Sequence, residues 1–156
     1  MANSTLTSNF NYLTPTGFRL TIDTSKYANI EYFLTGFSIP DVNLGDVPVT
    51  YRGVTGYVPG DKIEYGIMSC RFIIDEDMKN YIEVFNWMQS NIASTNVVTS
   101  DMILTILTSH NNPNKQFKFI NAFPTSLSGV EFSTQNTDIE YVQANVSFRY
   151  DRFTIL

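Results

Sequence analysis

The sequence has few of the residues from which reactive or cross-linked sites are built. Its 156 residues include one cysteine, one histidine and one tryptophan. A single cysteine excludes a disulfide within the chain and any metal site made of several cysteines. Cys70 stands among apolar neighbours in an expected strand, so we interpret it as a small buried residue. His110 lies in an expected turn, where a surface position is predicted and no partner for a catalytic pair is near in sequence.

Charge is scarce as well. Charged residues make up 16% of the chain, against about 25% in typical soluble domains. Because interfaces are depleted of charge at their centres, this low content indicates a surface that is partly covered by partners. Fifteen acidic and ten scattered basic residues give a net charge of −5. That balance disfavours tight nucleic-acid binding, which depends on basic side chains that neutralise phosphates.

Several familiar signals are also missing. No apolar run approaches the length of a membrane span, and the polar start MANSTLTSNFN does not resemble a signal peptide, so we expect no membrane anchor. The chain has no phosphate-binding glycine loop, nucleophile elbow, paired histidines or internal repeat. We therefore predict a protein that is not an enzyme and that needs no cofactor.

The length predicts one domain over residues 17–156, preceded by a flexible or partner-docked arm over residues 1–16 that is rich in Ser, Thr and Asn. Most of the domain has the alternating pattern of strands. Residues 18–23 alternate, a turn is expected at 24–26, and an aromatic-rich strand follows within 32–40. Residues 101–123 are expected to form a hairpin around HNNPNK, and residues 141–150 alternate strictly.

Residues 41–61 form a predicted long loop or extended hairpin arm. They hold four of the eight glycines and two of the six prolines, yet they are too apolar for disorder. An apolar segment of this kind is expected to dock on a neighbouring subunit, although it could also fold back on its own domain. The candidate interface residues are Val49, Tyr51, Arg52, Val54 and Tyr57.

The segment KIEYGIMSCRFIID, residues 62–75, is predicted to be one long strand. Its apolar period shifts by one residue beside Gly66, which is what a β-bulge produces. With the bulge, one face becomes polar: Lys62, Glu64, Ser69 and Arg71. The strand expected at 141–150 has a similar polar face, which includes Gln143, Asn145, Ser147 and Arg149.

Three consecutive acids, Asp75-Glu76-Asp77, follow that strand. Clustered carboxylates can hold a metal or perform acid–base chemistry, but no histidine or further carboxylate lies nearby in sequence. We favour a helix start with Asp75 as the N-cap and the other two acids in the first turn. The helix is then expected to bury an apolar stripe: Met78, Tyr81, Ile82, Phe85, Met88 and Ile92. The whole pattern predicts a mainly β protein, an antiparallel β-sandwich or barrel with one helix packed on it.

The order of these features resembles a known family. A segment SIPDVNLGDVPV leads to VPGDK, then to FIIDEDMKNYIEVFNWM, to FPTSLS and to a final DIEYVQANVSFRYDRF. Over residues 9–153 this order is similar to the tail tube proteins of T4-like contractile-tailed bacteriophages, including cyanophages.

The resemblance implies a structural virion protein, assembled in the host cytoplasm. It implies six-fold rings in which strands of all subunits join one ring-wide β-barrel, stacked into a tube inside a contractile sheath. Its partners would be further copies of itself, the sheath and the baseplate, while DNA passes through the lumen without specific binding. The lumen candidates are the two polar faces: Lys62, Glu64, Ser69, Arg71, Gln143, Asn145, Ser147 and Arg149.

Three alternatives stay open. The polar faces could be ordinary solvated surface. A channel for DNA is expected to be acidic so that it repels the phosphates, and the two arginines on these faces fit poorly with that. The same fold also serves baseplate rings that initiate the tube. Finally, a monomeric β-sandwich binding module would need an exposed aromatic platform.

Overall fold

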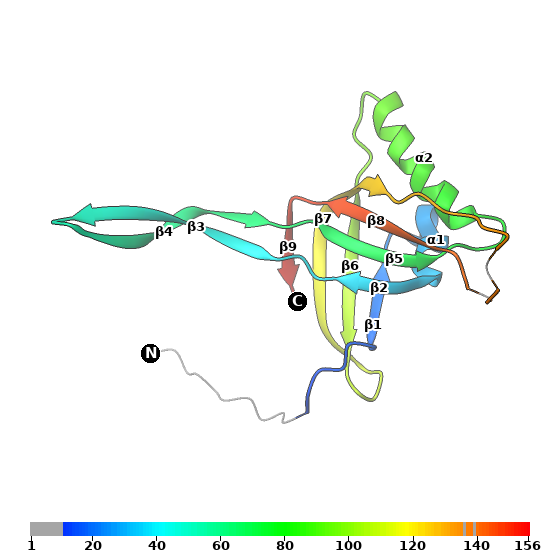
Figure 1. The fold of residues 1–156 in the computed structure, drawn as a ribbon, viewed down its shortest axis with the longest axis horizontal. Coiled ribbons are helices and arrows are strands. Elements are labelled where there is room, and N and C mark those ends of the chain that lie inside the picture. Colours follow the sequence, from blue (N-terminus) through cyan, green and yellow to red (C-terminus); the bar gives the residue numbers. More distant parts are fainter. Residues whose placement is uncertain (1–10, 136, 139) are drawn as a thin grey trace.

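The structure is a computed structural model that describes residues 11–135, 137–138 and 140–156. Its helices and strands are shown in Figure 1. In chain order they are β1 (Phe18–Thr21), α1 (Thr24–Tyr32), β2 (Leu34–Ser38), β3 (Val42–Tyr51), β4 (Val54–Tyr65), β5 (Met68–Ile73), α2 (Lys79–Ala93), β6 (Ser100–Leu107), β7 (Pro113–Leu127), β8 (Gln143–Arg149) and β9 (Arg152–Ile155). The protein is mainly β with antiparallel pairing, as the sequence predicts.

Seven strands form one sheet that divides into two parts at β7. The strand order is β1-β6-β7-β8-β5-β2, and β9 pairs with β7. The first part of β7 pairs with β6 and β9, whereas its last residues, 123–127, pair with β8. We call β1, β6, β9 and the first part of β7 sheet A. We call the end of β7 with β8, β5 and β2 sheet B.

The hydrophobic core contains side chains from both parts of the sheet. The Phe37 ring in sheet B lies 6.0 Å from the Phe119 ring in sheet A. The alternation read in residues 141–150 is confirmed, because Ala144, Val146 and Phe148 are completely buried. The largest fully buried side chains include Trp87, Phe72, Phe119, Phe148, Leu20, Ile30, Met68, Met102 and Leu104.

Trp87 of α2 links the helices to the sheet. Its ring stacks on Tyr27 of α1 at 4.1 Å and lies 5.8 Å from the ring of Phe148 in β8. Its indole Nε1 donates a hydrogen bond to the carbonyl oxygen of Val98, 2.9 Å away. A buried indole with its N–H satisfied contributes a large apolar area without leaving a donor unpaired.

The prediction of one helix is wrong, because α1 occupies the segment expected to hold a turn and the start of a strand. The helix is short, and its backbone departs from helical geometry at Tyr27 (φ −134°, ψ 38°). Its buried side chains include Tyr27 and Ile30, one turn apart. Such a short helix gives no apolar stripe over several turns, which is the signal by which sequence reasoning finds helices.

The apolar stripe predicted for α2 is confirmed in part, because Tyr81 and Met88 pack against the core, but the rest of it is wrong in phase. Ile82, Phe85 and Ile92 are 47%, 47% and 87% exposed, whereas the buried residues of α2 are Asn80, Val84 and Trp87. The buried face of the helix includes the polar residue Asn80, so its centre differs from that of the predicted apolar stripe. Asn80 belongs there because its side chain makes hydrogen bonds, and apolar spacing cannot reveal such a position.

The predicted long strand over residues 62–75 is two strands. β4 ends at Tyr65 and β5 begins at Met68, and the two strands pair with different partners. At the break, the Gly66 amide donates to the carbonyl oxygen of Asp41 at 2.9 Å. A β-carbon at Gly66 would overlap the Asp41 carboxylate. The glycine that suggested a bulge therefore marks the place where the chain passes from β4 into sheet B.

Candidate assembly surfaces

Strands β3 and β4 form a hairpin, which we call the arm, that projects away from the rest of the protein (Figure 1). Its two-residue turn, Arg52-Gly53, has positive φ at both positions (47° and 83°), as in the tight turns that suit a twisted hairpin. At the tip, the Arg52 guanidinium carbon lies 5.3 Å from the centre of the Tyr51 ring. All five predicted interface residues lie in the outer half of the arm, and all are exposed.

The apolar side chains of the arm change sides along its length. Near the root, Leu44 pairs with Ile63; toward the tip, Val47 pairs with Val58. The pairing register shifts between these two pairs, and alternation along β3 places them on opposite faces. Nine large hydrophobic residues of the arm are between 47% and 71% exposed: Val42, Leu44, Val47, Val49, Tyr51, Val54, Tyr57, Val58 and Ile63.

A cluster of aromatic rings fixes the root of the arm. The Tyr65 ring lies 5.3 Å from Phe153 of β9 and 6.1 Å from Tyr150. The Tyr150 hydroxyl donates a hydrogen bond to the Gly66 carbonyl oxygen, 3.0 Å away. Burial, with the nearby Asp41 carboxylate, raises the pKa of Tyr150 to about 12. The arm is thus held at its base, while the side chains along its length are exposed.

The outer face of sheet B carries a row of hydroxyl groups. Ser147 of β8 pairs with Ser69 on one side and Ser126 on the other, and Ser69 pairs with Ser38 of β2. In the neighbouring row, Arg71 Nε donates to the Asn145 side-chain oxygen at 3.2 Å. The four strand segments of sheet B contain two arginines, Arg71 and Arg149, and no acidic residue.

The structure therefore brings six of the eight candidate lumen residues onto sheet B: Ser69, Arg71, Gln143, Asn145, Ser147 and Arg149. The prediction that Lys62 and Glu64 share this face is wrong, because both lie on β4 near the root of the arm. There they form an exposed ion pair with 4.0 Å between Nζ and Oε1. The break at Gly66 separates them from β5.

The acidic triplet lies in a turn between β5 and α2. Met78, with a φ of 55°, occupies the N-cap position, so the prediction that Asp75 is the N-cap is wrong. Glu76 and Asp77 likewise precede the helix, whose first turn contains no acid. The reason is the turn itself, closed by a bond of 2.9 Å from the Met78 amide to the Asp75 carbonyl oxygen, which starts the helix later.

Asp75 nevertheless bonds to the start of the helix. Its carboxylate accepts from the Asn80 amide at 3.3 Å, and its own amide donates to the Asn80 side-chain oxygen at 3.4 Å. Asn80 Nδ2 also donates to the Ile73 carbonyl oxygen at 2.7 Å. These bonds satisfy one of the free N–H groups at the helix start. Among the described residues, no three His, Cys, Asp or Glu side chains are grouped to hold a metal.

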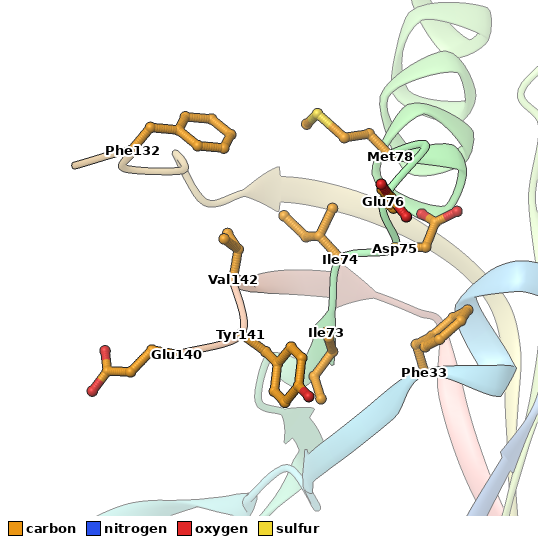
Figure 2. A pocket seen from close by; sticks show the side chains of 10 residues that line it. All are labelled: Phe33, Ile73, Ile74, Asp75, Glu76, Met78, Phe132, Glu140, Tyr141 and Val142. Atoms are coloured by element: carbon orange, nitrogen blue, oxygen red, sulfur yellow. The ribbon is translucent and has the colours of Figure 1, made fainter. Parts of the chain in front are cut away.

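A pocket of about 500 Å³ opens beside this turn; we call it the junction pocket (Figure 2). It is lined by Phe33, Ile73, Ile74, Asp75, Glu76, Met78, Phe132, Glu140, Tyr141 and Val142. Two backbone bonds hold its wall, from the Ile73 amide to the Phe33 oxygen at 3.0 Å and from the Ile74 amide to the Val142 oxygen at 2.9 Å. Sequence reasoning missed this pocket because three distant segments build it.

A scan against protein-family models and a search of curated proteins give no match to this chain. A comparison with solved structures does find matches. A chain of the anti-feeding prophage cap, which terminates the tube of that particle, superposes with a TM-score of 0.75 at 20% identity over 100% of this chain and 99% of its own. The protein has the fold of contractile-injection tube proteins.

Other structures with this tube fold agree along most of the chain. A chain of the sheath–tube complex of the PVC extracellular contractile injection system gives a TM-score of 0.73 at 17% identity, over 93% of this chain and 91% of its own. Hcp1 from Flavobacterium johnsoniae gives 0.55 at 14% identity, over 88% and 93%. The resemblance to tube proteins is thus confirmed at the level of the fold, without pointing to T4-like phages in particular.

Three smaller predictions can be placed on the tube fold. Cys70 is buried, and burial raises the pKa of its thiol. His110 is exposed in the turn between β6 and β7. Of the predicted N-terminal arm, residues 1–10 lie outside the described residues, and residues 11–16 are exposed. In the described part of the chain, no helix is both long and apolar enough to cross a membrane.

Proposed function

We propose that this protein is a structural subunit that assembles with copies of itself into six-fold rings, and that the rings stack into the tube of a contractile particle. The observation that carries the proposal is the arm, whose nine exposed apolar residues have no cover within the described chain. Exposed apolar area of this extent marks an interaction surface. The tube fold along the chain supports further copies as the partners.

The surfaces divide between assembly and channel in this proposal. The arm, with Val49, Tyr51, Arg52, Val54 and Tyr57, contacts neighbouring subunits. The hydroxyl-rich face of sheet B faces the lumen. Within the described residues no strand pairs with the outer edge of β2. Joining sheet B edges between subunits would complete a ring-wide barrel and remove edges that otherwise invite aggregation.

Two kinds of cargo are candidates for the content of the channel. As a phage tail tube, the channel delivers DNA, and the protein belongs to the virion with sheath and baseplate as partners. As the tube of a contractile injection system, the channel carries another cargo. The second candidate is favoured by Arg71 and Arg149 on an acid-free sheet B, because arginines hold phosphates instead of letting DNA pass. A ring at the baseplate that initiates the tube, or at its end, fits the same surfaces.

Size-exclusion chromatography with light scattering over a wide concentration range tests self-assembly. We expect a mass of six chains or a multiple of it. A clean monomer at every concentration would contradict the proposal and favour the β-sandwich binding module.

A further inference from the structure

We propose that the tip of the arm of one copy binds in the junction pocket of a second copy. This inference rests on the proposed self-assembly and names the surface that receives the arm. The occupant is a specific segment, residues 50–57, which includes the turn and the last cross-strand pairs of the hairpin.

The charges of the two surfaces are complementary. Segment 50–57 carries one charged residue, Arg52 at the turn. Three carboxylates, Asp75, Glu76 and Glu140, line the junction pocket, and no basic residue lines it. Asp75 is already bonded to the Asn80 amide, which leaves Glu76 and Glu140, both exposed, as the acids that an incoming guanidinium would meet.

The apolar parts match as well. Tyr51 and Val54, which pair across the hairpin beside the turn, are 69% and 71% exposed. In the pocket, Phe132 and Tyr141 are 75% and 74% exposed, which is unusual for rings within one folded chain. Figure 2 shows Ile74 and Val142 side by side at the opening, with Glu76 at the helix start on one side and Glu140 pointing outward on the other. An aromatic and aliphatic tip that carries one cation suits such a site.

The positions of the two surfaces require a second copy. The tip of the arm and the turn between β5 and α2 lie at opposite ends of the long axis of the molecule (Figure 1). A tip therefore cannot reach its own pocket. A tip-to-pocket contact between copies is head-to-tail, and contacts of this class generate closed rings or open stacks.

Charge reversal with rescue tests the inference. In Arg52→Glu the tip would meet the carboxylates with like charge, and we expect the concentration for half-maximal assembly to rise at least tenfold. Adding Glu76→Lys and Glu140→Lys to the same chain restores the opposite charges and should recover most of the assembly. Lys115→Glu, an equal charge change at an exposed position in β7, is the matched control and should assemble like the wild type.

Cross-linking tests the contact directly. The single native cysteine is buried, so it should not form disulfides with cysteines introduced at the surface. Two variants, Val54→Cys and Tyr141→Cys, are mixed and oxidised, and a disulfide-linked pair of chains is expected. The control pair uses Lys115→Cys, an exposed position in β7, in place of Tyr141→Cys and should give little product.

The outcomes separate this inference from the proposed function. If the wild type assembles, Arg52→Glu assembles equally well and the cross-link is absent, the tip-to-pocket contact is wrong while the proposed function stands. In that case another segment or another protein occupies the pocket. If the wild type is monomeric at every concentration and no cross-link forms, both are wrong.

Discussion

At the scale of single residues, Asn80 shows how a buried polar side chain fixes the junction between sheet and helix. It is completely buried and bonds the Ile73 oxygen, the Asp75 amide and the Tyr81 amide. The acidic triplet therefore has a structural setting: one of its members completes this network, and all three precede the helix.

We predict that Asn80→Ala lowers the free energy of unfolding by about 1–3 kcal/mol, because the part-buried Ile73 oxygen loses the hydrogen bond from the side chain. Urea denaturation followed by circular dichroism measures the change. Asn86→Ala, an exposed position on the same helix, is the control and should stay within about 0.5 kcal/mol of the wild type. Equal effects of both substitutions would contradict this role of Asn80.

Tyr150 gives the protein a defined sensitivity to alkaline pH. Its pKa is raised to about 12 from an ordinary value near 10, chiefly by burial. Because the folded state favours the neutral phenol, its contribution to stability is complete below about pH 10 and is lost as the pH rises through about 12.

We therefore expect wild type to lose stability between about pH 10 and 12 relative to Tyr150→Phe, which has no phenol to ionise. Near neutral pH the variant should be less stable by about 1 kcal/mol, because the bond to Gly66 is missing. Denaturant titrations at a series of pH values measure both effects. Tyr12→Phe, at a ring that is 95% exposed, controls for the loss of a phenol. Parallel pH profiles of wild type and Tyr150→Phe would contradict the assignment.

At the scale of secondary-structure elements, α2 is attached by one face, and the apolar residues of its other face remain in solvent. We predict that Trp87→Ala costs about 3–5 kcal/mol, since it leaves a cavity between α1, α2 and β8. Phe85→Ala, two residues away at a half-exposed position, should cost less than about 1 kcal/mol. Thermal unfolding of the two variants compares their stabilities. A larger loss of stability for Phe85→Ala would support the apolar stripe predicted from the sequence.

The elements that could be predicted are those whose burial alternates without interruption. The strand β8 shows this, because Ala144, Val146 and Phe148 all face the core. Helix α1 could not be found, since it is short and kinked at Tyr27. The phase of α2 was misread because Asn80 stands where an apolar residue is normally expected. β9, which pairs with β7 through four residues, was missed because it is very short.

Of the candidate surfaces, the arm could be predicted from the sequence and the junction pocket could not. The arm could be located from its glycines, prolines and apolar residues, because these types report on local backbone and exposure. The junction pocket could not, because it depends on which distant segments meet around Ile74 and Val142. Lys62 and Glu64 were misplaced because a glycine between strands can mark either a bulge or a departure from the sheet.

The outer part of the arm can be removed without touching the core. We predict that replacing residues 49–58 by an Asn-Gly turn leaves a domain that unfolds cooperatively near the wild-type temperature, because these residues are exposed and the root cluster around Tyr65 remains. The variant should no longer polymerise. Circular dichroism and light scattering measure the two properties. Tubes of normal length from this variant would contradict the role of the arm.

At the scale of the whole molecule, three exposed features fit the proposed assembly. The chain exposes an apolar arm on one side, a pocket rimmed with aromatic rings at the opposite end and, within the residues that the structure describes, the unpaired edge of β2 in sheet B. Each feature would be covered in an assembly of identical copies. The hydroxyl-rich face of sheet B is the exception, since its serines, asparagine and arginines suit contact with water.

Electron microscopy of the purified, concentrated protein tests the central claim most directly. The account predicts rings with six-fold rotational symmetry and an open centre, stacked into tubes at higher concentration, with sheet B lining the channel in the reconstruction. Particles no larger than one chain at every concentration, or assemblies without a central channel, would contradict it.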